Sequence, residues 1–81
     1  MKCIVIDDEP LAASLIENFV KRTPGLELTG AYTDPAEGFN AIKEQLPDIV
    51  FLDIQMPDIN GVELARMLPQ QVCVIFTTAF K

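Results

Sequence analysis

The chain has 81 residues, with 6 Lys and Arg against 12 Asp and Glu, and its formal net charge of −6 disfavours direct binding to nucleic acid or to an anionic membrane. At this length we expect one domain with a thin core, and a composition of 49% apolar and 22% charged residues is typical of a globular chain. Because the sequence contains no His, it excludes His-based zinc sites, Ser-His-Asp triads and a phosphohistidine of its own.

The cysteines and the apolar runs indicate a cytoplasmic protein. Cys3 and Cys73 are too few for a thiolate metal site, and each lies in an apolar run, so we expect two buried free thiols in a reducing compartment. The longest apolar stretch, residues 72–76, is far shorter than a membrane span. Acidic residues follow Ile6, where a signal peptide would continue its apolar region.

Short apolar runs alternate with amphipathic stretches along the first half of the chain. Residues 3–6 are a continuous apolar run, which is typical of a strand covered on both faces. A helix is predicted from Pro10 to Arg22 by apolar residues at helical spacing, namely Leu11, Leu15, Ile16, Phe19 and Val20. Residues 26–32 alternate more, which indicates a second strand near a sheet edge.

The second half repeats this alternation. A capping box of Asp34 and Glu37 predicts a helix that continues to Leu46 and ends at Pro47. Residues 48–54 contain the second fully apolar strand, which stops at Asp53 before a turn over residues 56–61. A short third helix follows and is expected to end at Pro69, with the side chains of Val62, Ala65 and Leu68 pointing inward. The last buried strand is predicted at residues 72–76.

This order predicts an α/β fold with a doubly wound parallel sheet, right-handed crossovers and the strand order 2-1-3-4. Parallel strands bring their carboxyl ends to one edge, and the reversal between the first and third strands opens a crevice there. The residues expected at that edge are Asp7, Asp8, Asp53 and Thr78.

Converging carboxylates repel one another, and a divalent cation is the simplest way to stabilise them. With oxygen ligands and no His or thiolate in reach, Mg²⁺ or Mn²⁺ is favoured, and the waters it retains leave room for a phosphate. Asp53, at the end of a buried strand, is the candidate nucleophile towards a phosphoryl group. Taken singly, however, Asp8 is equally a helix cap, Asp53 a turn residue and Thr78 a strand residue without function.

Three segments together carry a family resemblance: residues 6–11 (IDDEPL), 52–64 (LDIQMPDINGVEL) and 76–80 (FTTAF). In this spacing the chain resembles the receiver domain of two-component response regulators, which has a flavodoxin-like fold. The last segment is similar to regulators that carry a LytTR-type DNA-binding output domain. The resemblance implies a phosphoacceptor that controls an output, such as transcription, located outside this chain. It also implies that the domain has at most self-phosphorylation and self-dephosphorylation activity.

The resemblance also implies a role for each site residue. Asp53 matches the aspartate that takes a phosphoryl group from a sensor histidine kinase. Asp8 and Asp53 match the side-chain ligands of Mg²⁺, Gln55 matches the ligand that acts through its backbone carbonyl, and Asp7 matches an acid that acts through water. Thr78 matches the hydroxyl that bonds a phosphoryl oxygen.

The match covers the whole chain but only the earlier part of the family's domain, without its fifth strand, its last helices and the lysine that pairs with the phosphoryl group. One face of the third and fourth strands, within residues 49–52 and 72–76, should therefore be open to water, and we expect homodimers or other self-association. An inactive receiver-like fragment that serves only for dimerisation or docking is the alternative. A flavin-binding function is disfavoured because Asp7 and Asp8 stand where a flavin phosphate needs hydrogen-bond donors.

Overall fold

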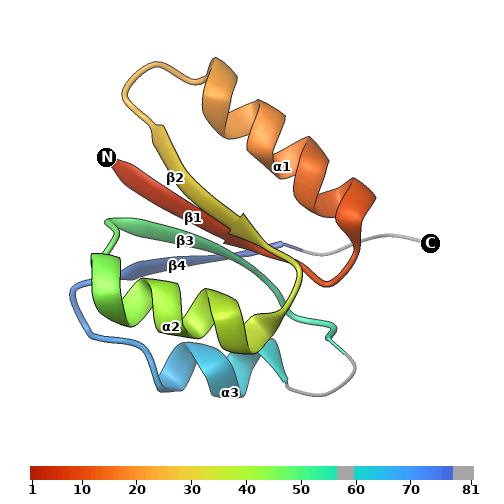
Figure 1. Ribbon diagram of the computed structural model, residues 1–81. Coiled ribbons are helices and arrows are strands. Elements are labelled where there is room, and N and C mark those ends of the chain that lie inside the picture. The colour runs from red at the N-terminus through yellow and green to blue at the C-terminus, as the bar shows by residue number, and fades with distance from the viewer. Residues whose placement is uncertain (57–59, 78–81) are drawn as a thin grey trace.

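The computed structural model describes residues 1–56 and 60–77 (Figure 1). Its elements in chain order are β1 (Lys2–Ile6), α1 (Pro10–Arg22), β2 (Glu27–Tyr32), α2 (Pro35–Gln45), β3 (Ile49–Asp53), α3 (Gly61–Arg66) and β4 (Cys73–Thr77). Within these ranges the strands form one parallel sheet in the order β2-β1-β3-β4, so the predicted flavodoxin-like topology is confirmed. Helix α1 covers one face of the sheet, and α2 and α3 cover the other (Figure 1).

Local sequence signals set where the helices begin and end. Pro10 starts α1, where its missing N–H has no intrahelical partner to lose. The Asp34 side chain accepts a hydrogen bond from the Ala36 N–H at 3.0 Å, which caps α2. At the other end of α2, Leu46 adopts the left-handed conformation with φ 47°, and Pro47 follows it. None of the helices in the described ranges has the length and apolar character that crossing a bilayer requires.

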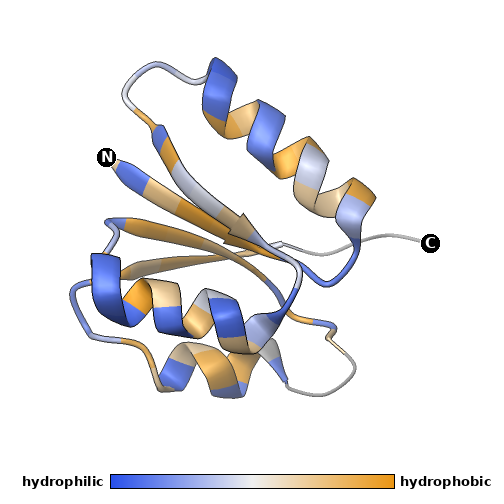
Figure 2. Ribbon diagram, in the orientation of Figure 1, coloured by the Kyte–Doolittle hydropathy of each residue, from blue (hydrophilic) through white to orange (hydrophobic). Residues whose placement is uncertain are grey.

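The two central strands are buried on both faces, which explains their continuous apolar runs (Figure 2). Alternate side chains of β1 and β3 form the core under α2 and α3, with Ile4, Ile6, Val50, Leu52, Ile42 and Leu64 among its members. The intervening side chains form the core under α1, with Cys3, Val5, Ile49, Phe51, Ala13 and Val20. The sheet is thus held by two separate apolar layers.

The edge strand β4 is less covered than we expected from its apolar sequence. Cys73 is exposed, so the prediction that both cysteines are buried is wrong for Cys73. Ile75 and Phe76 are 41% and 43% exposed. Cys73 and Ile75 share the sheet face of Ile49 and Phe51, and they are exposed because α1 packs over β1 and β2 and does not extend across the sheet to β4 (Figure 1). Phe76 lies on the opposite face, beside Leu52.

The open face is nevertheless narrower than predicted, because the α1-facing side chains of β3 are covered. Ile49 and Phe51 are only 8% and 6% exposed. The ring of Phe19 on α1 packs edge-on against Phe51, with 6.4 Å between the ring centroids. The prediction of an open face therefore holds for β4 and is wrong for β3.

The core-facing side of α3 and the residues after it differs from the prediction at one position, Val62. Leu64 is 2% exposed, and Ala65 and Leu68 pack against the same core, whereas Val62 is 39% exposed. Two residues correspond to a rotation of about 200° around a helix, so Val62 points away when Leu64 points inward. Val62 was therefore wrongly placed in the core.

Replacing these two residues tests the orientation of α3. Leu64→Ala should lower the free energy of unfolding by about 2 to 3 kcal/mol, because it removes a fully buried side chain. Val62→Ala should change it by less than about 0.5 kcal/mol. Urea unfolding followed by circular dichroism measures both values, and equal losses would contradict the orientation described.

Candidate functional site

The acidic edge, defined as Asp7, Asp8 and Asp53, lies where β1 and β3 end. Asp7 and Asp8 follow directly on β1, and Asp53 is the last residue of β3. These strands are parallel neighbours, and Ile6 pairs with Leu52 in their register. The next residue of each strand is an aspartate, so the register alone places Asp7 beside Asp53.

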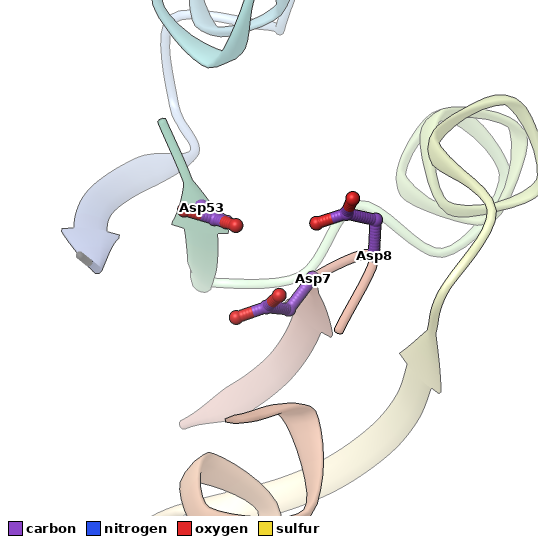
Figure 3. Close-up of side chains that lie close together, drawn as sticks. All are labelled: Asp7, Asp8 and Asp53. Carbon is purple, nitrogen blue, oxygen red and sulfur yellow. The ribbon is translucent and has the colours of Figure 1, made fainter. Parts of the chain in front are cut away.

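The three side chains point towards one another (Figure 3). Each offers one carboxylate oxygen, and these oxygens all lie within 4.8 Å of one another. Asp7 and Asp53 are 3% and 4% exposed, while Asp8 is partly exposed. The structure therefore brings together the three carboxylates whose convergence the topology predicted.

Backbone amides hold two of these side chains in place. One oxygen of Asp7 accepts the Glu9 N–H at 2.9 Å, and one oxygen of Asp53 accepts the Gln55 N–H at 3.1 Å. Both are local turns in which an aspartate bonds the amide two residues ahead. The turn role and the site role are thus compatible, because the bond to each turn amide leaves the carboxylate a second oxygen.

A contact from β2 also fixes Asp7. The backbone N–H of Asp7 donates to the carbonyl of Tyr32 at 3.0 Å, which extends the pairing of β1 and β2 by one residue. Tyr32 was not among the site residues suggested by the sequence. A backbone carbonyl can be supplied by any residue type, so the sequence carries no signal for this contact.

The negative charges of the three carboxylates at this edge repel one another. Burial raises the pKa of Asp7, the Glu9 N–H acts in the opposite direction, and the neighbouring charges of Asp53 and Asp8 raise the pKa further. A set of hard oxygen donors with a surplus of negative charge fits a small divalent cation such as Mg²⁺. The residues present therefore suit the ion that the sequence indicated.

Two further residues were expected at this edge. Gln55 is exposed, lies two residues after Asp53 and forms an antiparallel bridge with Asn60. Thr78 lies outside the described residues. Met56, the first residue of the predicted turn, is 8% exposed and belongs to the core under α2 and α3.

Comparison with known families identifies this arrangement. The sequence model of the response regulator receiver domain matches residues 3–81. The chain belongs to this family. The receiver domain is 38% identical over 82 residues to the transcriptional regulatory protein BtsR of Escherichia coli (strain K12), a match that covers 99% of this chain and 34% of BtsR.

Other relatives join this domain to a different activity. The domain is 40% identical over 81 residues to protein-glutamate methylesterase/protein-glutamine glutaminase 2 of Vibrio vulnificus (strain YJ016), which covers 95% of this chain and 24% of that protein. The chain thus spans about a third or less of the length of these curated relatives.

Solved structures agree with the fold. The response regulatory domain of protein mrkE from Klebsiella pneumoniae superposes with a TM-score of 0.84 at 28% identity, covering 100% of this chain and 69% of that one. The response regulator domain of Thermotoga maritima CheB gives a TM-score of 0.84 at 25% identity, covering 96% and 60%.

The raised pKa of Asp7 has a measurable consequence for stability. A group whose pKa is higher in the folded than in the unfolded state favours folding when protonated, and this contribution is lost as the pH rises through the folded-state pKa. Asp7→Asn should therefore be more stable than the native chain at pH 7. The difference should shrink as the pH falls through the raised pKa of Asp7 and should vanish below the ordinary aspartate pKa of about 4.

Thermal unfolding between pH 3 and pH 7 measures this difference. Asp34→Asn is the matched control, because it removes one charge from an exposed helix cap where asparagine caps equally well. A similar gain in the control, or a gain in Asp7→Asn that does not depend on pH, would contradict the assigned cause.

Proposed function

We propose that this receiver domain is the phosphoacceptor switch of a two-component phosphorelay, in which Asp53 takes a phosphoryl group from a sensor histidine kinase. The observation that supports this most is the meeting of the Asp7, Asp8 and Asp53 carboxylates within 4.8 Å at the end of adjacent strands. The family match supports the partner class, because response regulator receiver domains act in general with histidine kinases.

Each residue of the acidic edge has a distinct proposed role. Asp8 and Asp53 hold Mg²⁺ through their side chains, Gln55 holds it through its backbone carbonyl, and Asp7 acts through a water molecule. When bound, the ion neutralises charge on the phosphoryl oxygens as they approach an acidic surface. Thr78, which lies outside the described residues, is proposed to donate its hydroxyl to a phosphoryl oxygen.

Asp53 is the proposed acceptor because of its place in the group. It faces Asp7 and Asp8, which follow β1 (Figure 3), so one of its oxygens can attack phosphorus. The cation that these carboxylates would hold would neutralise the charge on the phosphoryl oxygens. The bond to the Gln55 N–H holds the carboxylate in a fixed orientation.

The transfer itself exchanges one bond for another. A carboxylate oxygen of Asp53 forms a P–O bond as the P–N bond of the kinase phosphohistidine breaks. The electron pair of the broken bond returns to the imidazole nitrogen, which takes a proton from solvent. The products are an aspartyl phosphate on this domain and a neutral histidine on the kinase.

Binding of the phosphoryl analogue beryllofluoride tests the acceptor. Fluorine NMR should show a bound signal with Mg²⁺ present, and Asp53→Asn should abolish it because the attacking oxygen is lost. Asp34→Asn is the control and should retain the signal. Absence of any bound signal from the native chain or from a longer native chain that contains it would contradict the proposal and favour an inactive docking module.

The consequence of phosphorylation is proposed to be control of an output. Relatives of this domain include a transcriptional regulatory protein and a methylesterase, which shows that the domain occurs with different activities. We favour transcription as the regulated process and the cytoplasm as the location. In this proposal the domain transfers phosphate only to itself and to water, and it does not contact nucleic acid directly, in keeping with its charge of −6.

The exposed side chains of β4 lead to a proposal about assembly. Ile75 and Phe76 alternate along an edge strand, so apolar groups are exposed on both of its faces. An edge strand of this kind favours pairing with another chain. We propose that the 81-residue polypeptide self-associates through β4.

Sedimentation velocity over a range of protein concentrations tests this assembly. Association should weaken in Ile75→Lys, because a charge on the strand opposes pairing. Leu11→Lys is the control, since Leu11 is 76% exposed on α1, which packs over β1 and β2. A native chain that remains monomeric throughout, or an equal loss in both variants, would contradict the role of β4.

A further inference from the structure

We propose that Gly38 is a positioning residue for the acidic edge: the absence of a side chain lets α2 close onto the carboxyl ends of β1 and β2, which fixes the backbone that carries Asp7 and Asp8. This inference rests on the proposed function, because it concerns how well the edge holds Mg²⁺. Gly38 lies in the first turn of α2 and does not belong to the acidic edge itself.

The space beside Gly38 is already filled. A methyl group built on Gly38 would lie 2.6 Å from Cδ1 and 2.7 Å from Cγ1 of Ile6, well inside van der Waals contact. The same methyl would lie 3.4 Å from Cβ of Tyr32. A larger residue at position 38 therefore requires α2, Ile6 or both to move.

Ile6 has little freedom to give way. It is fully buried in the core under α2 and α3, where it packs with Ile42 on α2 and Leu52 on β3. Protein cores are close-packed, so a displaced side chain transmits strain to its own backbone and to its neighbours. The strain from a methyl at position 38 would consequently reach the end of β1.

The two residues that contact this space are the ones that hold Asp7. Ile6 is joined to Asp7 by a peptide bond, and the carbonyl of Tyr32 accepts the Asp7 N–H at 3.0 Å. Asp7 and Asp8 follow one another, so a shift of Ile6 or Tyr32 moves both carboxylates relative to Asp53. Magnesium requires near-ideal geometry, which makes its binding sensitive to such a shift.

The choice of glycine also needs an explanation from packing. Glycine is less favourable than alanine in a helix, so local propensity alone would favour alanine at this position. The fit between an isoleucine at position 6 and a glycine at position 38 supplies the missing reason. The same fit predicts that one methyl can be moved from Ile6 to position 38 with little change in total volume.

Titration with MgCl₂, followed through backbone amide NMR shifts of the acidic edge, tests this role. Gly38→Ala should raise the dissociation constant for Mg²⁺ by about tenfold, the low end of the range seen when residues behind metal ligands are changed. The double variant Gly38→Ala/Ile6→Val should restore affinity to within about threefold of the native chain. Valine lacks Cδ1, conserves the total volume, and can turn about χ1 so that a hydrogen replaces Cγ1 at the contact. Asn40→Ala, an exposed change on the same helix, should leave affinity unchanged.

The possible outcomes separate this inference from the function on which it rests. If the native chain shows no saturable Mg²⁺ binding, the proposed function fails. If the native chain binds Mg²⁺ and Gly38→Ala binds it equally well, only the positioning role is overturned. The positioning role is also overturned if Gly38→Ala binds Mg²⁺ weakly and the added Ile6→Val change does not restore the affinity. Should Gly38→Ala fail to fold, the double variant compared with Ile6→Val alone decides the question, because the inference expects these two to bind Mg²⁺ within about threefold of each other.

Discussion

Repulsion between like charges at the end of two buried strands is the constraint on which this domain depends. The register of β1 and β3 places Asp7 beside Asp53, and Asp8 completes the group. An apolar core beneath these carboxylates fixes their backbone, so they cannot relax apart without disrupting the sheet. The charge surplus that costs stability in the absence of a cation is the same property that suits the edge to a divalent cation and a phosphoryl group.

Much of this arrangement could be predicted from the sequence, because the signals are periodic and the topology follows from them. The continuous apolar runs around Val5 and Val50 identify strands covered on both faces, and the alternation after Leu26 identifies an edge. Once the order 2-1-3-4 is accepted, the aspartates that follow the first and third strands must share one edge. The convergence of Asp7, Asp8 and Asp53 could therefore be predicted from the sequence alone.

The features that sequence reasoning missed depend on contacts between elements. Cys73 belongs to an apolar run, yet it is exposed because α1 does not reach β4. Leu64, and not Val62, faces the core because the phase of so short a helix is poorly defined by three apolar positions. The carbonyl of Tyr32 and the close approach of Gly38 to Ile6 are properties of backbone placement, which residue type alone does not reveal.

Chemical phosphorylation is the most direct test of the claim that the acidic edge holds a cation for phosphoryl transfer to Asp53. The intact protein would be incubated with phosphoramidate, with and without Mg²⁺, then reduced with borohydride, which converts an acyl phosphate on aspartate to homoserine, and mapped by peptide mass spectrometry. Homoserine is expected at position 53 only when Mg²⁺ is present. Equal modification without Mg²⁺, or modification at another aspartate while Asp53 stays intact, would contradict it.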